Sequence, residues 1–92
     1  MSNASVSKEI VLDAQQICRD VISILSKSAW DLNAKYQSAG EKWKDDKYRQ
    51  LGVIVSDCDR AIKSPEVELY ECNDKLYEIF KILLEYESTN IT

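Results

Sequence analysis

The chain has 92 residues, of which 45% are apolar and 30% charged, and its net charge at pH 7 is −4. This length is that of a single domain, and this composition is typical of a soluble chain that folds and excludes a disordered one. Basic residues are scattered among acidic ones, which argues against a nucleic-acid partner, because binding to phosphates needs a basic surface.

The first predicted helix runs from about residue 13 to residue 39. Only two glycines and one proline occur in the chain, which favours long helices over sheets joined by tight turns. Asp13 is placed as the N-cap, with Gln16 as its capping-box partner. Gly40 is predicted to end the helix in the left-handed conformation and to open a turn over residues 40–45. The apolar face follows three-four spacing and consists of Ala14, Cys18, Val21, Leu25, Ser28, Leu32, Tyr36 and Ala39.

The predicted turn contains Trp43, a large apolar side chain in a highly charged segment. The apolar faces of two antiparallel helices converge at such a turn. Trp43 is therefore predicted to cover the end of these faces, against Tyr48 and Leu51. Asp45 or Asp46 is predicted to cap the second helix, because carboxylates are favourable at the positive N-terminal end of a helix.

The second predicted helix runs from about residue 46 to residue 87. Pro65 removes a backbone donor and either kinks or splits this helix. A kinked but continuous helix is favoured, because the apolar spacing passes through the proline without a phase slip. The end of this helix would lack a partner within the chain, since it exceeds the first helix by roughly 15 residues. The predicted apolar face consists of Tyr48, Leu51, Val55, Cys58, Ile62, Pro65, Leu69, Cys72, Leu76, Ile79, Leu83 and Tyr86.

Together these elements predict an all-α fold, a single domain over residues 1–92 that forms an antiparallel helical hairpin. A two-helix hairpin buries one stripe of each helix, yet further apolar residues flank both stripes. The chain is therefore predicted to dimerise into a four-helix bundle, with itself or with a related hairpin. The sequence leaves two roles open for Trp30, packing in the core or anchoring an interface. The candidate partner interface comprises Ile24, Trp30, Tyr77, Phe80 and Leu84.

Residues with catalytic or ligand-binding chemistry are few. The sequence has no histidine, which removes the usual general base and the commonest neutral metal ligand. Its carboxylates are interpreted as helix caps and a solvated surface. Cys18, Cys58 and Cys72 form no Cys-x-x-Cys pair and are predicted to be small core residues in a reducing cytoplasm. The sequence thus predicts a non-enzymatic protein with no metal, no cofactor and no small-molecule ligand.

The stretch Trp43-Lys44-Asp45 between two long helices resembles the turn of the Trp-x-Gly (WXG) helical-hairpin family of type VII secretion in Gram-positive bacteria. In this chain Asp45 stands where that family has glycine. The family's export signal is Tyr-x-x-x-Asp/Glu at the end of the second helix. Tyr86 and Asn90 stand at the corresponding positions, with Asn90 in place of the acid. The resemblance implies an accessory member that lends a composite signal to a larger secreted toxin.

Two functions follow as expectations. The first is a secreted substrate of type VII secretion, or an adaptor or chaperone that pairs with the helical N-terminal region of a toxin. The second is a cytoplasmic immunity or antitoxin-like protein that binds and neutralises a toxin. No apolar run approaches the roughly 20 residues of a membrane span. No signal peptide of the usual kind is recognised. The expected location is the cytoplasm, or outside the cell after export without a cleaved signal peptide.

Overall fold

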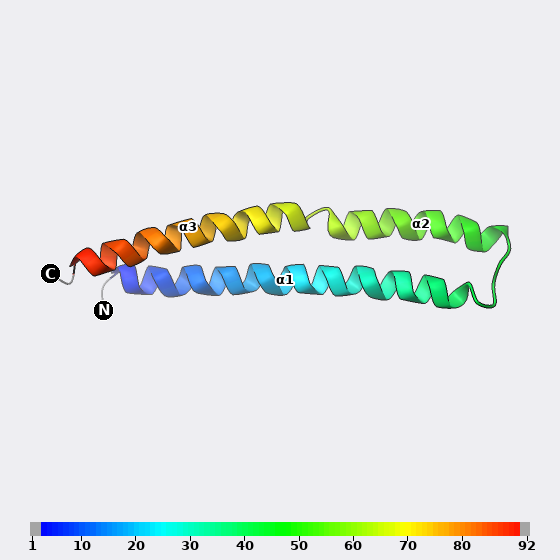
Figure 1. The fold of residues 1–92 in the computed structure, drawn as a ribbon, viewed down its shortest axis with the longest axis horizontal. Coiled ribbons are helices and arrows are strands. Elements are labelled where there is room, and N and C mark those ends of the chain that lie inside the picture. The colour runs from blue at the N-terminus through cyan, green and yellow to red at the C-terminus, as the bar shows by residue number, and fades with distance from the viewer. Residues whose placement is uncertain (1–2, 91–92) are drawn as a thin grey trace. The chain divides into compact units, whose positions relative to one another are not determined.

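The computed structural model describes residues 3–90, without the side chains of residues 4, 5, 89 and 90. The described residues form three helices and no strand, namely α1 (Asn3–Ala39), α2 (Asp46–Lys63) and α3 (Glu66–Asn90), as Figure 1 shows. This arrangement confirms the predicted all-α helical-hairpin fold.

The helices are divided between two compact units. The turn unit covers residues 22–66, and in it the second part of α1 and α2 run antiparallel and are joined by the turn. The terminal unit consists of the described residues of 1–21 and 67–92, and it pairs the first part of α1 with α3. Lys8 near the start of α1 forms an ion pair with Glu87 near the end of α3, with 2.7 Å between Nζ and Oε2. The two helices of the terminal unit are therefore antiparallel as well.

The start of α1 differs from the prediction. The helix begins at Asn3, so Asp13 lies within it as an exposed residue and is not its N-cap. The stretch before Asp13, which was predicted to lie outside the helix, contains the β-branched Val11, and Val11 is buried. Burial outweighs the weak preference of such residues for strands, because tertiary packing supplies most of a helix's stability in a folded protein. The first part of α1 pairs with α3, so the expectation that the end of the second helix lacks a partner is also wrong.

The start of α2 agrees with the prediction. Asp45 is the N-cap in an extended conformation, and its side chain accepts hydrogen bonds from the backbone N–H groups of Lys47 and Tyr48, at 2.9 and 3.1 Å. Asp46 is the first residue of the helix and places a second carboxylate in its first turn. The side chain of Asp45 thus satisfies two of the backbone donors that a helix start leaves without an intrahelical partner.

Pro65 divides the helix predicted over residues 46–87. α2 ends at Lys63 and α3 begins at Glu66, so the interruption lasts two residues. Ser64 keeps helical backbone angles (φ −57°, ψ −35°), and its N–H donates to the carbonyl oxygen of Arg60 at 2.9 Å. The break is local, as expected for a residue that removes one backbone donor without inserting a loop.

Buried and half-buried residues follow each helix at alternating spacings of three and four, and we call these positions the seam. The spacing continues across Pro65, from Ile62 to Glu66 and Leu69. The seam on α1 comprises Val11, Gln15, Cys18, Ile22, Leu25, Ala29, Leu32 and Tyr36. On α2 and α3 it comprises Tyr48, Gly52, Val55, Asp59, Ile62, Glu66, Leu69, Asn73, Leu76, Phe80, Leu83 and Glu87.

The apolar face predicted over residues 46–87 is therefore only half right. Every second member lies one position before a seam residue: Cys58 and Cys72 are exposed, whereas Asp59 and Asn73 are half-buried. Cys18 is half-buried, so the prediction of three core cysteines is wrong for two of them. A search for apolar spacing selects the cysteine in each case, because the seam position itself holds a polar residue.

Two polar seam residues, Asp59 and Glu66, accept hydrogen bonds from side chains of α1. Asn33 donates from Nδ2 to Asp59 Oδ1 at 2.7 Å and to the carbonyl oxygen of Ala29 at 2.8 Å. Ser26 donates from Oγ to Glu66 Oε1 at 3.1 Å. Such partners reduce the cost of placing polar groups between helices.

Candidate functional site

Two tyrosines from facing helices close the turn unit. The rings of Tyr36 on α1 and Tyr48 on α2 are stacked, with centroids 4.3 Å apart and an interplanar angle of 7°. Each hydroxyl donates a hydrogen bond to the backbone carbonyl oxygen of the other tyrosine, at 3.1 Å from Tyr36 and at 2.7 Å from Tyr48. This reciprocal arrangement fixes the register of the two helices, because sliding either helix would break both bonds.

Both glycines of the chain lie beneath these hydroxyl groups. A Cβ atom built at Gly52 would overlap the hydroxyl of Tyr36, and one built at Gly40 would overlap the hydroxyl of Tyr48. The prediction of a left-handed Gly40 is wrong, because neither glycine has a positive φ. Close approach of a side chain from the facing helix, not a special backbone conformation, is what requires glycine here. The sequence contains this arrangement twice, as Tyr-x-x-x-Gly at residues 36–40 and at residues 48–52.

Trp43 is held beside the start of α2. Its Nε1 donates to Asp45 Oδ1 at 2.7 Å, and its ring lies 5.8 Å from the ring of Tyr48 at an angle of 54°. The same carboxylate oxygen caps α2, so one atom of Asp45 both orients the indole and satisfies the helix start. A glycine in place of Asp45 has no side chain and could do neither. The predicted contact between Trp43 and Tyr48 is confirmed, and Trp43 remains 40% exposed.

The tyrosine pair makes stability sensitive to alkaline pH. Burial raises the pKa of the Tyr48 hydroxyl above its ordinary value of 10.0, and its hydrogen bond and electrostatic interaction with Tyr36 raise it further. The unfolded chain therefore loses this proton at lower pH than the folded one. The resulting stability is fully present below pH 10.0 and is lost as the pH rises through the raised pKa of the folded state.

We accordingly expect the free energy of unfolding to fall as the pH rises above about 10, and to fall less steeply in a Tyr48→Phe variant. Urea unfolding of both proteins at pH values from about 8 to 11 measures this difference. Equal slopes in the two proteins would show that Tyr48 does not contribute.

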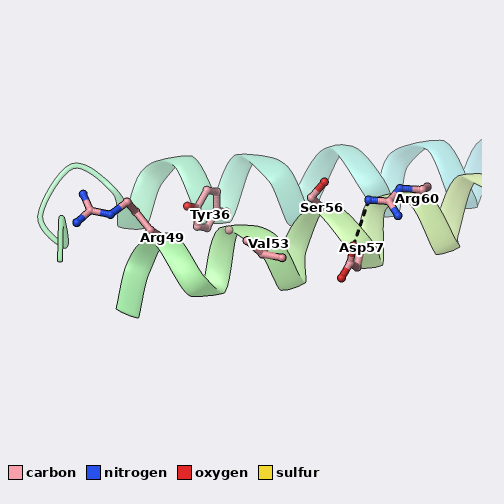
Figure 2. A pocket seen from close by; sticks show the side chains of 7 residues that line it. Tyr36, Arg49, Val53, Ser56, Asp57 and Arg60 are labelled. Atoms are coloured by element: carbon pink, nitrogen blue, oxygen red, sulfur yellow. Dashed lines mark hydrogen bonds and ion pairs between the residues drawn. The ribbon is translucent and has the colours of Figure 1, made fainter. Parts of the chain in front are cut away.

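A shallow hollow lies beside the tyrosine pair on the surface of the turn unit (Figure 2). Arg49 and Arg60 lie at its two ends, with Tyr36 between them. Both guanidinium groups have carboxylate partners on their own helix: Arg49 pairs with Asp46, and Arg60 with Asp57 at 3.1 Å. The charges of the two arginines and of their two aspartate partners cancel, so the hollow carries no net positive charge that would attract an anion.

Four of the five residues predicted as a partner interface are exposed. Ile24 and Trp30 belong to the turn unit and are 63% and 69% exposed. Tyr77 and Leu84 belong to the terminal unit and are 50% and 42% exposed. Phe80 is half-buried at a seam position, so its role is structural. The exposure of Trp30 rules out core packing within the chain for that residue.

The residues predicted as export-signal positions lie in the last turns of α3. Tyr86 is exposed. Asn90 is the last residue of the helix, and its side chain lies outside the described ones. Tyr86 follows Ile79 by seven residues and Ile82 by four, so the three side chains share one side of α3.

A second apolar stripe runs along each helix of the terminal unit, and the predicted apolar faces mix its residues with those of the seam. Each of its members directly precedes a seam residue, so the stripe repeats the three-four spacing of the seam about 100° away around the helix axis. Apolar doublets such as Ile17-Cys18 and Ile82-Leu83 are the signal that separates the two stripes. The members are Ile10, Ala14, Ile17 and Val21 on α1, and Cys72, Ile79, Ile82 and Tyr86 on α3.

The two stripes lie on the same side of the terminal unit. One shallow hollow is lined by Asn3 and Ser7 of α1 and by Ile82, Leu83 and Tyr86 of α3. Asn3 and Ser7 continue the α1 stripe at the same spacing, and Ile82 and Tyr86 belong to the α3 stripe. We call the larger exposed side chains of the two stripes the apolar face. They are Ile10 and Ile17 (both 62% exposed), Val21 (36%), Ile79 (48%), Ile82 (62%) and Tyr86 (58%).

Over residues 3–90, no helix is both long enough and apolar enough to cross a membrane. The same part of the chain contains no group of three or more side chains placed to hold a metal ion. No family model, curated protein or solved structure matches the chain. Its class is therefore defined by its own structure, an all-α helical hairpin with an exposed apolar face on its terminal unit.

Proposed function

We propose that the protein is a non-enzymatic binding protein whose apolar face packs against the helices of another protein. The observation that carries this proposal is the exposure of six large apolar side chains on one side of a unit made of two helices. A pair of helices covers one stripe of each helix, and here each helix has two stripes. Contiguous exposed apolar surface of this kind marks interaction sites on proteins.

The geometry favours helices as the partner. The seam and the second stripe are about 100° apart on each helix. In a four-helix bundle each helix contacts two neighbours at about 90° to one another, so one stripe would face the neighbour within the hairpin and the other a neighbour from the partner. A partner hairpin, identical or related, would complete such a bundle.

Within this class we propose a hairpin protein of type VII secretion, either a secreted substrate or the adaptor of a larger secreted toxin. Support comes from the resemblance of the Trp43-Lys44-Asp45 turn to that of the WXG family, and from the position of Trp43 beside the N-cap of the second helix. An adaptor would pair with the helical N-terminal region of a toxin through its apolar face. It would work in the cytoplasm or leave the cell without a cleaved signal peptide.

A toxin-neutralising immunity protein is the second candidate, and the acidic residues of α3 favour it. Glu68 and Glu71 are both exposed, and an inhibitor that covers a basic site on a toxin would depend on such residues. The two functions differ in whether binding requires the apolar side chains, which makes them separable by substitution.

Association is expected to fall at least tenfold in an Ile82→Glu variant, because a charge would be desolvated at the centre of the contact. Light scattering after size-exclusion chromatography measures the molar mass of the associated species. It is applied to the chain alone, whose monomer has a mass of 10.6 kDa, and to its complex with the helical N-terminal region of a toxin after co-expression. Phe80→Glu is unsuitable as a test, because Phe80 belongs to the seam. Val53→Glu is the matched control, since Val53 is 64% exposed on α2 of the turn unit.

Unchanged association in the Ile82→Glu variant would contradict the proposed function. Loss of a toxin complex in a Glu68→Lys/Glu71→Lys variant, with normal binding by Ile82→Glu, would establish the immunity function instead. Circular dichroism of each variant checks that its helices remain formed.

A further inference from the structure

The net charge of the chain is unevenly divided between its two units. The terminal unit has nine acidic and four basic side chains, a net charge of −5, whereas the turn unit has seven acidic and eight basic ones, a net charge of +1. Together they give the net charge of −4 of the whole chain. The unit that bears the apolar face is therefore the one that carries the negative potential.

Acidic residues border the apolar face along both helices. Each of them directly precedes a residue of the second stripe, and they recur at intervals of seven residues: Asp13 and Asp20 on α1, and Glu71, Glu78 and Glu85 on α3. Asp20 lies three residues after Ile17, and residues three apart are neighbours on a helix surface. Two basic residues interrupt this pattern on α3: Lys75 occupies a stripe position, and Lys81 directly precedes Ile82 and pairs with Glu78. The margins of the apolar face are thus predominantly acidic on both helices.

Contacts within the chain leave these carboxylates at the surface. Glu78 pairs with Lys81 at 3.1 Å, and 65% of its side chain is exposed. Asp20 accepts a hydrogen bond from Gln16 at 2.8 Å and is also exposed. Exposed pairs of this kind contribute little by themselves, so Asp20 and Glu78 can also interact with a partner that carries positive charge.

A second copy of this chain would be poorly matched to this face. Two copies meeting through their apolar faces would bring acidic margins against acidic margins, and like charges at an interface disfavour the pairing. A partner whose apolar stripe is bordered by basic residues would bury the same apolar side chains and pair with the margins as well.

We infer that the apolar face of the terminal unit receives an amphipathic helix whose own apolar stripe is flanked by lysine or arginine. The helix lies along the groove between α1 and α3, with its apolar residues on Ile17, Ile79 and Ile82 and its basic residues toward Asp13, Asp20 and Glu71. This is the helix-in-groove mode of peptide recognition. The inference rests on the proposed function and specifies the chemistry of its partner.

Two synthetic helical peptides test the inference. Both have the same leucine stripe at three-four spacing, and one has lysine where the other has glutamate at the flanking positions. Fluorescence anisotropy with the full chain is expected to show that the lysine peptide binds at least tenfold more tightly. Its affinity is expected to fall when the salt concentration is raised, because salt screens exposed charges.

Neutral variants separate the charge from the apolar contact. Asp13→Asn/Asp20→Asn/Glu71→Gln is expected to remove most of the preference for the lysine peptide. The matched control is Asp57→Asn, an exposed acid of the turn unit, which should leave the preference unchanged. Ile17→Glu and Ile82→Glu should each abolish binding of the lysine peptide while the helical content measured by circular dichroism stays the same.

The possible failures are distinguishable. Equal binding of both peptides, lost in Ile82→Glu, would overturn the charge inference and leave the proposed function standing. Self-association through the apolar face, with no binding of either peptide, would identify a second copy as the occupant and also overturn the inference. Peptide binding that survives both isoleucine substitutions would contradict the inference and the proposed function together.

Discussion

Replacing Ile22 by alanine is expected to lower the free energy of unfolding by about 2–4 kcal/mol, whereas the same replacement at Ile24 should change it by less than about 0.5 kcal/mol. The two residues lie two positions apart on α1 and belong to the same unit. Ile22 is 7% exposed in the seam, and Ile24 is 63% exposed. Only at Ile22 does the shorter side chain leave a cavity between helices. Urea unfolding of the two variants gives both values.

Two valines on α2, Val55 and Val53, allow the same comparison as Ile22 and Ile24. Val55 is 7% exposed and Val53 is 64% exposed, and both belong to α2. Val55→Ala should destabilise the protein and Val53→Ala should not. Equal losses at Ile22 and Ile24 would mean that a partner covers Ile24 under the conditions of measurement, or that the seam is wrongly assigned. Repeating the measurement at several protein concentrations separates these explanations, because stability that comes from association depends on concentration.

Replacing Gly52 by alanine is expected to destabilise the protein by about 1–3 kcal/mol, against the usual preference of helices for alanine. Within a helix the exchange of glycine for alanine normally gains up to about 1 kcal/mol. Here the new Cβ atom would overlap the hydroxyl of Tyr36. To make room, Tyr36 would have to give up its stacking on Tyr48 and its hydrogen bond to the Tyr48 carbonyl oxygen.

The sign of this effect should reverse when the tyrosine is absent. Tyr36→Ala alone is expected to cost about 2–3 kcal/mol, since it removes a half-buried ring and a hydrogen bond. In that background Gly52→Ala meets no ring and should stabilise the protein by up to about 1 kcal/mol. A double-mutant cycle by urea unfolding measures the coupling. Stabilisation by Gly52→Ala in the unaltered chain would show that the close approach is not needed.

The fold class and the turn were predictable because their signals are local. Low glycine and proline content indicated long helices, and the aspartates after a polar turn indicated a second helix capped by Asp45 or Asp46, of which Asp45 is the cap in the structure. The contact of Trp43 with Tyr48 followed from the convergence of two apolar faces at a turn. Each of these inferences needs only neighbours within a few residues along the chain.

The seam was harder to predict because apolar spacing alone cannot identify it. Cys58 and Asp59 are adjacent, and hydrophobicity selects the cysteine, yet Asp59 occupies the seam and is bound by Asn33 from the facing helix. That partner lies 26 residues away in the sequence. The start of α1 was missed for a related reason, since the helical state of Val11 depends on burial in a unit completed by α3.

Exposed apolar surface could be predicted from the sequence, whereas the residues that form the apolar face could not. Excess apolar surface was apparent from the composition of both helices, and Ile24, Tyr77 and Leu84 are indeed exposed. The position of the apolar face depends on which of two adjacent apolar residues lies in the seam, and at Ile82 and Leu83 it is Leu83. The roles of Gly40 and Gly52 were also out of reach, because they depend on tyrosines of the facing helix.

The two units also differ in how far along the chain their contacts reach. Tyr36 and Tyr48 are 12 residues apart, whereas Lys8 and Glu87 are 79 residues apart. Closing the longer segment from an unfolded chain costs about 1.7 kcal/mol more in chain entropy. The turn unit should therefore form first during folding, and the terminal unit should complete itself only after α3 has been synthesised. Until then the seam and the second stripe on the first part of α1 are both uncovered. A partner helix could therefore bind the nascent chain before α3 packs against α1.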